Sequence, residues 1–349
     1  MMVRAFKISS LALFSVALAA SASWAHEAWI LTPREIEALA EAPIPALFLS
    51  QMWLLVAAAL SAGVALAALS AEDRFGAEID ARLRPLASSA VEIGPTILRI
   101  STGLMLGLAA LGGLPRHGVE PWTTPTFLVP DMALNLVPGW DILAPVQFAL
   151  ALFLILGLAV RLCGAVLVAL SVLGLAIFGA GFVAYAPHFA APGIMLMLAG
   201  SGAAAVDRLL GTDALFRPGP EVQQAAWRAT QILVGAGFIY LAVAYKLFQP
   251  TLIIAILDHG NVPTLGLPLP VVALLMTSVE ITAGALLVMG RLVRPMAALL
   301  IGAMTFLAVV LGETPLFHAN LYGVMVFYLM VGERFPRGVQ ITPRMREAM

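Results

Sequence analysis

A run of 21 residues from Pro270 to Gly290, PVVALLMTSVEITAGALLVMG, constrains the fold of this chain more than any other stretch. It is long enough for a helix to cross a bilayer, and it carries one charge, Glu280, at its midpoint. A carboxylate at that depth is costly in free energy, so by default it faces the protein interior and has a function. The run therefore predicts a membrane-spanning helix with a buried acid.

The composition indicates a chain whose surroundings are mostly lipid. Hydrophobic residues make up 61% of the sequence and charged residues only 11%, and the mean hydropathy is +0.97. These values exclude an ordinary soluble domain and make the lipid bilayer the main partner, with no nucleic acid expected. The single cysteine, Cys163, excludes an internal disulfide, a CxxC redox pair and a cysteine-ligated iron–sulfur cluster.

The N-terminus is typical of a secretory signal peptide over residues 1–25. Arg4 and Lys7 give the positive start, an apolar centre follows, and a small-x-small cleavage site ends at Ala25. Cleavage there leaves His26 as the first residue of the mature chain. The alternative is an uncleaved first transmembrane helix, and with either interpretation the segment after Ala25 lies outside the cytoplasm.

Apolar stretches of membrane-spanning length recur along the rest of the chain. Residues 26–47 form a short periplasmic segment with three prolines, and the tail over 336–349 is polar and basic. The charged segment EDRFGAEIDARLRP is expected to lie at the membrane interface between two crossings. The sequence thus predicts nine mature spans, at roughly 48–70, 94–113, 141–160, 164–186, 189–206, 229–247, 269–290, 295–312 and 317–332.

The distribution of basic residues predicts the orientation. Nine crossings from an outer N-terminus place the 336–349 tail in the cytoplasm, and the loops on that side then hold most of the arginines. The predicted outer side has only Arg34, Arg116 and Lys246. We therefore expect a periplasmic mature N-terminus and a cytoplasmic C-terminus.

An internal repeat organises the spans. Arg161 and Arg291 are 130 positions apart, and so are His188 and His318. Each unit has four spans, which is an even number, so both units enter the membrane in the same direction. The predicted fold class is an all-α polytopic membrane protein with two tandem four-helix bundles and one extra N-terminal transmembrane helix. The units cover residues 94–206 and 226–335, and the extra helix covers 48–70.

The second unit resembles the DoxX family of small four-helix membrane proteins. The matching pieces are GAGFIYLAVAYKLFQP and VEITAGALLVMGRLVRP, which hold Lys246 near the outer end of one span and Glu280 within the next. The first unit is a weaker match that keeps LGLAVRLCG and the span lengths. It has Leu150 where the 130-residue spacing would place the glutamate, and Gln147 is its nearest polar substitute, about one helical turn away.

The resemblance implies a bundle in the bacterial inner membrane. One branch of the family is similar to the small subunit of a thiosulfate:quinone oxidoreductase, and other members accompany amine-utilisation or redox systems. For this chain the resemblance implies a quinone-associated redox subunit or accessory. Quinone is then the candidate cofactor, and a redox partner subunit would supply the electrons.

Glu280 is the candidate catalytic residue. We expect it to handle a proton beside a quinone or cation path, and the alternative is a structural carboxylate bonded to a neighbouring helix. Lys246, Tyr245 and Thr277 are the candidate substrate-binding residues, although a snorkelling lysine with interfacial tyrosines is the simpler interpretation. A direct ion pair between Lys246 and Glu280 is not expected unless the helices are offset, because one lies at the outer rim and the other at mid-span.

The histidines indicate a second function class, because all five are expected at the outer face. His26, His188 and His318 are candidate metal ligands, since neutral imidazoles gathered in an oxidising compartment suit copper or zinc. Periplasmic copper handling is therefore an alternative function. No HxH or HxxxH spacing occurs, so ordinary interfacial positions also explain these residues. A non-catalytic membrane assembly or transport protein is a further alternative.

Overall fold

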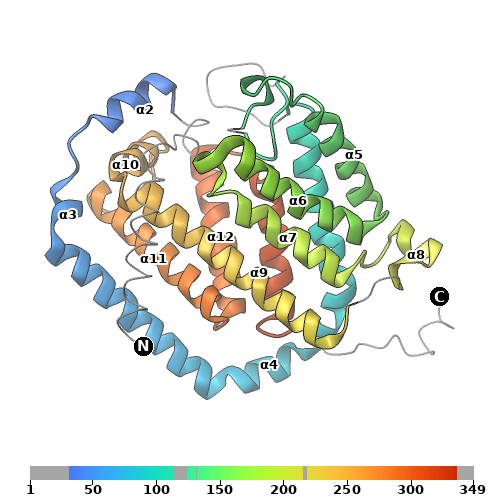
Figure 1. Ribbon diagram of the computed structural model, residues 1–349. Coiled ribbons are helices and arrows are strands. Elements are labelled where there is room, and N and C mark those ends of the chain that lie inside the picture. The colour runs from blue at the N-terminus through green and yellow to red at the C-terminus, as the bar shows by residue number, and fades with distance from the viewer. Residues whose placement is uncertain (1–30, 114–123, 131, 215–217, 336–349) are drawn as a thin grey trace, which may run out of the picture.

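The computed structural model describes residues 31–113, 124–130, 132–214 and 218–335, and these residues form an α-helical protein (Figure 1). The predicted signal peptide, His26, Arg116 and the 336–349 tail lie outside the described residues. The main helices are α2 (Pro33–Ala40), α3 (Ala46–Leu49), α4 (Gln51–Ala110), α5 (Leu143–Leu156), α6 (Val160–Phe178), α7 (Ala186–Ala199), α8 (Val206–Leu210), α9 (Pro220–Leu241), the π-helix η4 (Ala242–Leu247), α10 (Pro250–His259), α11 (Leu269–Met289), α12 (Val293–Leu311), the 3-10 turn η5 (Pro315–His318) and α13 (Ala319–Val331).

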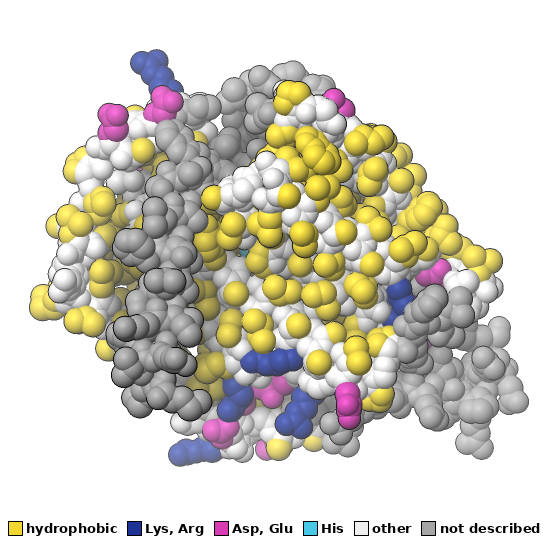
Figure 2. Space-filling view, viewed as in Figure 1, with side chains coloured by type: hydrophobic (Ala, Val, Ile, Leu, Met, Phe, Trp, Pro, Cys, Tyr) yellow, Lys and Arg dark blue, Asp and Glu magenta, His cyan; other side chains and the backbone are white. Residues whose placement is uncertain are grey.

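Six helices in the described part of the chain are long and apolar enough to cross a membrane, and four shorter apolar helices accompany them. Hydrophobic side chains cover much of the face shown in Figure 2, whereas Lys and Arg side chains gather toward one end of it. The chain is thus an all-helical integral membrane protein. The predicted positions of most spans agree with helices, but the ten-residue helix α10 was not predicted.

The charged segment after residue 70 does not interrupt the helix as expected. Helix α4 runs for 60 residues from the predicted extra span, through that segment, into the first helix of the first unit, with Pro85 and Pro95 inside it. Eight of the 14 residues of this segment are Ala, Leu, Glu or Arg, which are strong helix formers, and a proline inside a long helix bends it more readily than it ends it. Figure 1 shows α4 curving around the bundle.

The two units pack against each other through their first and last helices. Helix α13 packs along α4, and α7 packs along α9, so each unit's last helix lies against the other unit's first. Within each unit the first two helices, α4 with α5 and α9 with α11, also pack together. The central core therefore belongs to both units, and it includes the fully buried side chains of Trp227, Tyr328, Phe327 and Leu98.

Matching turns give the true spacing of the repeat. Gly157 and Gly290 end α5 and α11 in the left-handed conformation, with φ of 71° and 67°. Two residues later Ala159 and Leu292 are also left-handed, with φ of 50° and 53°, and a helix of 19 residues follows each. The spacing at this turn is 133 residues, not 130, because short length differences between the units lie elsewhere in the chain.

Arginines anchor the same places in both units. Arg99 donates to the carbonyl oxygens of Leu154 and Ile155, 2.9 and 2.5 Å away, at the end of α5. Arg228 donates to the carbonyl oxygens of Leu287 and Val288 at the end of α11. Arginine suits this role because its planar fork offers several donors to the carbonyl groups that a helix end leaves unpaired.

The predicted pairing of Arg161 with Arg291 is wrong. Arg161 donates to carbonyl oxygens at the end of α7, and the residue that does the same at the end of α13 is Arg294. Arg291 instead forms ion pairs with Glu72 and Asp73 of α4, and the hydrogen bonds that it donates to both carboxylates raise its pKa. The extra helical segment is thereby tied to the second unit.

Candidate functional site

A cavity of about 130 Å³ lies between the two units and is lined mostly by apolar side chains. Helices α4 and α7 of the first unit contribute to its wall, as do α9, η4, α11, α12, η5 and α13 of the second. Its polar lining includes Lys246, Glu280, His188, His318 and Asn320. A largely apolar cavity with a few convergent polar groups is the usual form of a small-molecule site.

Lys246 and Glu280 form an ion pair on the wall of this cavity, so the expectation that they would not meet is wrong. Their side chains are 20% and 13% exposed. The pair forms because α9 and α11 approach closely at Gly235 and Gly284, where a β-carbon on Gly284 would lie 2.7 Å from the Gly235 carbonyl oxygen. Beyond this contact the helices remain near enough for the long lysine side chain to reach the acid.

Lys246 is carried by the π-helix η4, which continues α9. Such wide turns are uncommon and occur often at functional sites, because they re-aim a side chain without ending the helix. Nothing in the sequence AVAYKL distinguishes this turn from an ordinary α-helical one. Sequence reasoning therefore placed the lysine at the rim, whereas the structure directs it to the acid.

The other predicted substrate-binding residues lie beside the cavity and do not line it. Tyr245 is 3% exposed, and its ring packs edge-on against Tyr240 with centroids 6.3 Å apart. Thr277 is buried, and its hydroxyl donates to the carbonyl oxygen of Ala273 in its own helix at 2.7 Å. Both side chains support the walls around the Lys246–Glu280 pair, which itself faces the cavity.

The structure brings His188 and His318 to the same cavity as Glu280. Asn320, which sequence reasoning missed, donates from its side-chain amide to the His188 carbonyl oxygen at 2.9 Å and holds the start of α7 against α13. The C-terminal glycines Gly200 and Gly332 end α7 and α13 in the same conformation. Aligned on them, His188 corresponds to Asn320, not to His318 as predicted.

A metal centre finds no support in the part of the chain that the structure describes. Those residues contain no group of three or more His, Cys, Asp or Glu side chains arranged to hold a metal ion. His26, the principal predicted copper ligand, lies outside them. His188 and His318 therefore remain candidates only as members of the cavity wall.

The first unit carries an amide where the second carries the acid. With the spacing of 133 residues, the counterpart of Glu280 is Gln147, not Leu150 as predicted from the spacing of 130. Gln147 is fully buried. Its side-chain nitrogen donates to the Thr126 carbonyl oxygen at 3.0 Å, and its oxygen accepts from the Leu128 amide at 2.7 Å.

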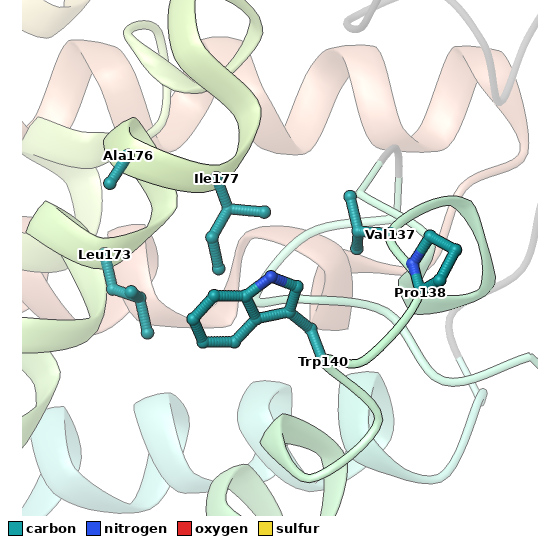
Figure 3. Close-up of a pocket in the computed structure, with 6 residues that line it drawn as sticks. All are labelled: Val137, Pro138, Trp140, Leu173, Ala176 and Ile177. Atoms are coloured by element: carbon teal, nitrogen blue, oxygen red, sulfur yellow. The ribbon is translucent and has the colours of Figure 1, made fainter.

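A larger hollow of about 490 Å³ lies at the end of α6, where the indole of Trp140 points toward Leu173 and Ile177 (Figure 3). The remaining side chains that line it are also apolar: Val137, Pro138 and Ala176. With no acid, base or nucleophile among these residues, the hollow offers a surface for packing. The smaller cavity, with its ion pair and histidines, is therefore the better candidate site.

Comparison with known protein families, curated proteins and solved structures gave no match. The resemblance to the DoxX family rests on the sequence pieces themselves.

Proposed function

We propose that this chain is a DoxX-like, quinone-associated membrane protein in which Lys246 and Glu280 bind and protonate a quinone head group. The observation that carries the proposal is the Lys246–Glu280 ion pair on the wall of an apolar cavity between membrane-length helices. An intramembrane ion pair is costly to keep unless it serves a site, because both ions are removed from water.

The ion pair suits the chemistry of quinone reduction. A quinone takes up two electrons and two protons to become a quinol, and negative charge develops on its oxygens as the electrons arrive. An ammonium group next to one oxygen stabilises that charge, and the effect is stronger where water is excluded. Lys246 would fill this role, and Glu280, a carboxylate in the ion pair, would take up a proton from the aqueous side and pass it to the reduced oxygen.

That transfer leaves Glu280 as a carboxylate again and restores its ion pair with Lys246. The second proton is delivered in a second such cycle. The two electrons come from a redox centre on a partner subunit. The rest of the lining is mostly apolar, which favours a flat uncharged ring over a hydrated ion and argues against an ion-transport path.

The proposed location is the bacterial inner membrane, with the mature N-terminus periplasmic. The argument is the excess of arginines at one end of the bundle, among them Arg161, Arg228, Arg291 and Arg294 at or near inner turns. In this orientation the histidine-bearing starts of α7 and α13 lie toward the outer side.

The test is Glu280→Gln, assayed as quinone-dependent electron transfer in membranes at matched protein level. We expect a loss of about 100-fold, which is typical for removal of a proton donor. Ser278→Ala is the matched control, because Ser278 lies on the same helix and its hydroxyl bonds only to the Leu274 carbonyl oxygen among the bonds seen here. Normal electron transfer in Glu280→Gln, or an equal loss in Ser278→Ala, would sink the proposal.

A further inference from the structure

The loop of the first unit that follows α4 is folded back on itself. Thr126 pairs with Ala133, and the Phe127 amide donates to the Met132 carbonyl oxygen at 2.7 Å. The Thr126 amide also donates to the Ala109 carbonyl oxygen near the end of α4, at 2.9 Å. Residues 126–130, which we term the wall segment, are therefore held at a fixed place at the end of the bundle.

The wall segment contains a strained residue that Gln147 compensates. Leu128 has φ of 62°, in the left-handed region that side chains other than glycine rarely adopt. The Gln147 amide holds the backbone on both sides of Phe127, through the Thr126 carbonyl oxygen and the Leu128 amide. Both groups are buried, so without Gln147 each loses a hydrogen bond that water cannot readily replace.

The next two residues of the wall segment, Val129 and Pro130, line the same cavity as Lys246 and Glu280. We propose that Gln147 is a positioning residue for that site, because it fixes the wall segment and thereby closes the cavity on the side of the first unit. The first unit thus contributes to the site of the second through an amide at the position of the acid.

This inference rests on the proposed function only for the identity of the ligand. A wall that closes the cavity controls how tightly a head group is held and does not carry out its protonation. Loss of Gln147 is therefore expected to raise KM for quinone with little change in kcat. Loss of Glu280 acts in the opposite way, mainly on kcat.

The direct experiment measures access to the cavity and needs no quinone. In a Cys163→Ser background, Leu321→Cys places the only thiol on the cavity wall, and N-ethylmaleimide labels it in full-length protein in lipid nanodiscs. We expect Gln147→Leu to speed labelling about tenfold, because two buried backbone groups lose their partner and the wall segment opens. Ser171→Ala is the control, since it removes a buried hydroxyl of α6 that bonds to the Leu167 carbonyl oxygen.

Gln147→Glu gives a second test that does not depend on Gln147→Leu folding. When protonated, the acid can accept from the Leu128 amide and donate to the Thr126 carbonyl oxygen, as the amide does. When ionised, it loses the donor. The measured quantity is the labelling rate of Gln147→Glu divided by the rate of the Gln147 parent at the same pH. This ratio should be near one at acidic pH and rise above one at alkaline pH.

The proposal is overturned if labelling in Gln147→Leu equals that of the parent, or if Ser171→Ala speeds it equally. A flat pH profile for Gln147→Glu at the parent rate also overturns it. These outcomes are independent of the proposed function, because labelling involves neither quinone nor electron transfer. If Glu280→Gln leaves electron transfer normal while Gln147→Leu still opens the cavity, the quinone proposal fails and the positioning role stands.

Discussion

The two halves of this protein carry different side chains, an amide and an acid, at equivalent positions of the same helical repeat. In both, an arginine donates to the carbonyl oxygens at the end of the second helix, and left-handed residues form the turn that follows. About two helical turns before those carbonyls, the first half has Gln147, which is hydrogen-bonded to the backbone of Thr126 and Leu128. The second half has Glu280, bound by Lys246 and facing a cavity.

The difference shows which half can do chemistry. A fully buried neutral amide that makes two backbone hydrogen bonds has no acidic proton to give. A carboxyl group can take up and release a proton. The shared frame supplies rigidity to both halves, and only the second adds a titratable group at the wall of a cavity.

The largest expected effect comes from breaking the ion pair on one side. Lys246→Met leaves Glu280 as a largely buried acid without its cation, and we expect a loss of about 3–5 kcal/mol in the free energy of unfolding. The measurement is reversible unfolding in mixed micelles. The double variant Lys246→Met with Glu280→Met should recover most of this loss, since an apolar pair of similar volume needs no desolvation. Equal destabilisation in the single and double variants would contradict the pairing.

The close approach of α9 and α11 at Gly235 is the basis of the next test. A β-carbon on Gly235 would lie 2.9 Å from the Val288 backbone nitrogen and nearer still to the Gly284 carbonyl oxygen, whereas one on Gly107 of α4 would meet only the Ala151 β-carbon at 3.7 Å. Gly235→Ala should therefore cost about 1–3 kcal/mol and separate Lys246 from Glu280.

Gly107→Ala is the matched control and should be neutral or slightly stabilising, because alanine favours the helix and the space is open. Both variants can be compared by thermal unfolding and by electron transfer. If Gly235→Ala kept full stability and activity, the close approach of α9 and α11 would not explain the Lys246–Glu280 ion pair.

The sequence was sufficient to predict an all-helical membrane protein and to single out Glu280, because both follow from apolar length and one buried charge. The repeat was visible, but its spacing was not, since apolar helices carry few markers of register. Arg161 could be paired with Arg291 or Arg294, which stand three residues apart around one turn, and only their carbonyl partners decide between them. That choice determines whether Leu150 or Gln147 is the counterpart of the acid.

The Lys246–Glu280 contact was beyond sequence reasoning for a different reason. It depends on how closely two helices approach and on a π-helical turn, and both are consequences of packing. The role of Asn320 and of the wall segment likewise depends on which helices of the two units meet.

The smallest expected effect is that of Thr277→Val, which tests whether Thr277 binds the ligand or only supports the helix that carries Glu280. Thr277 lies one turn before Glu280, which made it a candidate ligand residue, yet its hydroxyl is turned to the Ala273 carbonyl oxygen of α11. That carbonyl already accepts the helical bond of the following turn, so Thr277→Val should change stability by less than about 1 kcal/mol. It should also leave KM for quinone within about twofold, because so small a change in binding free energy has little effect on affinity. A tenfold rise in KM, measured beside the Ser278→Ala control, would show that Thr277 contacts the ligand. The cavity would then extend along α11 when ligand is present.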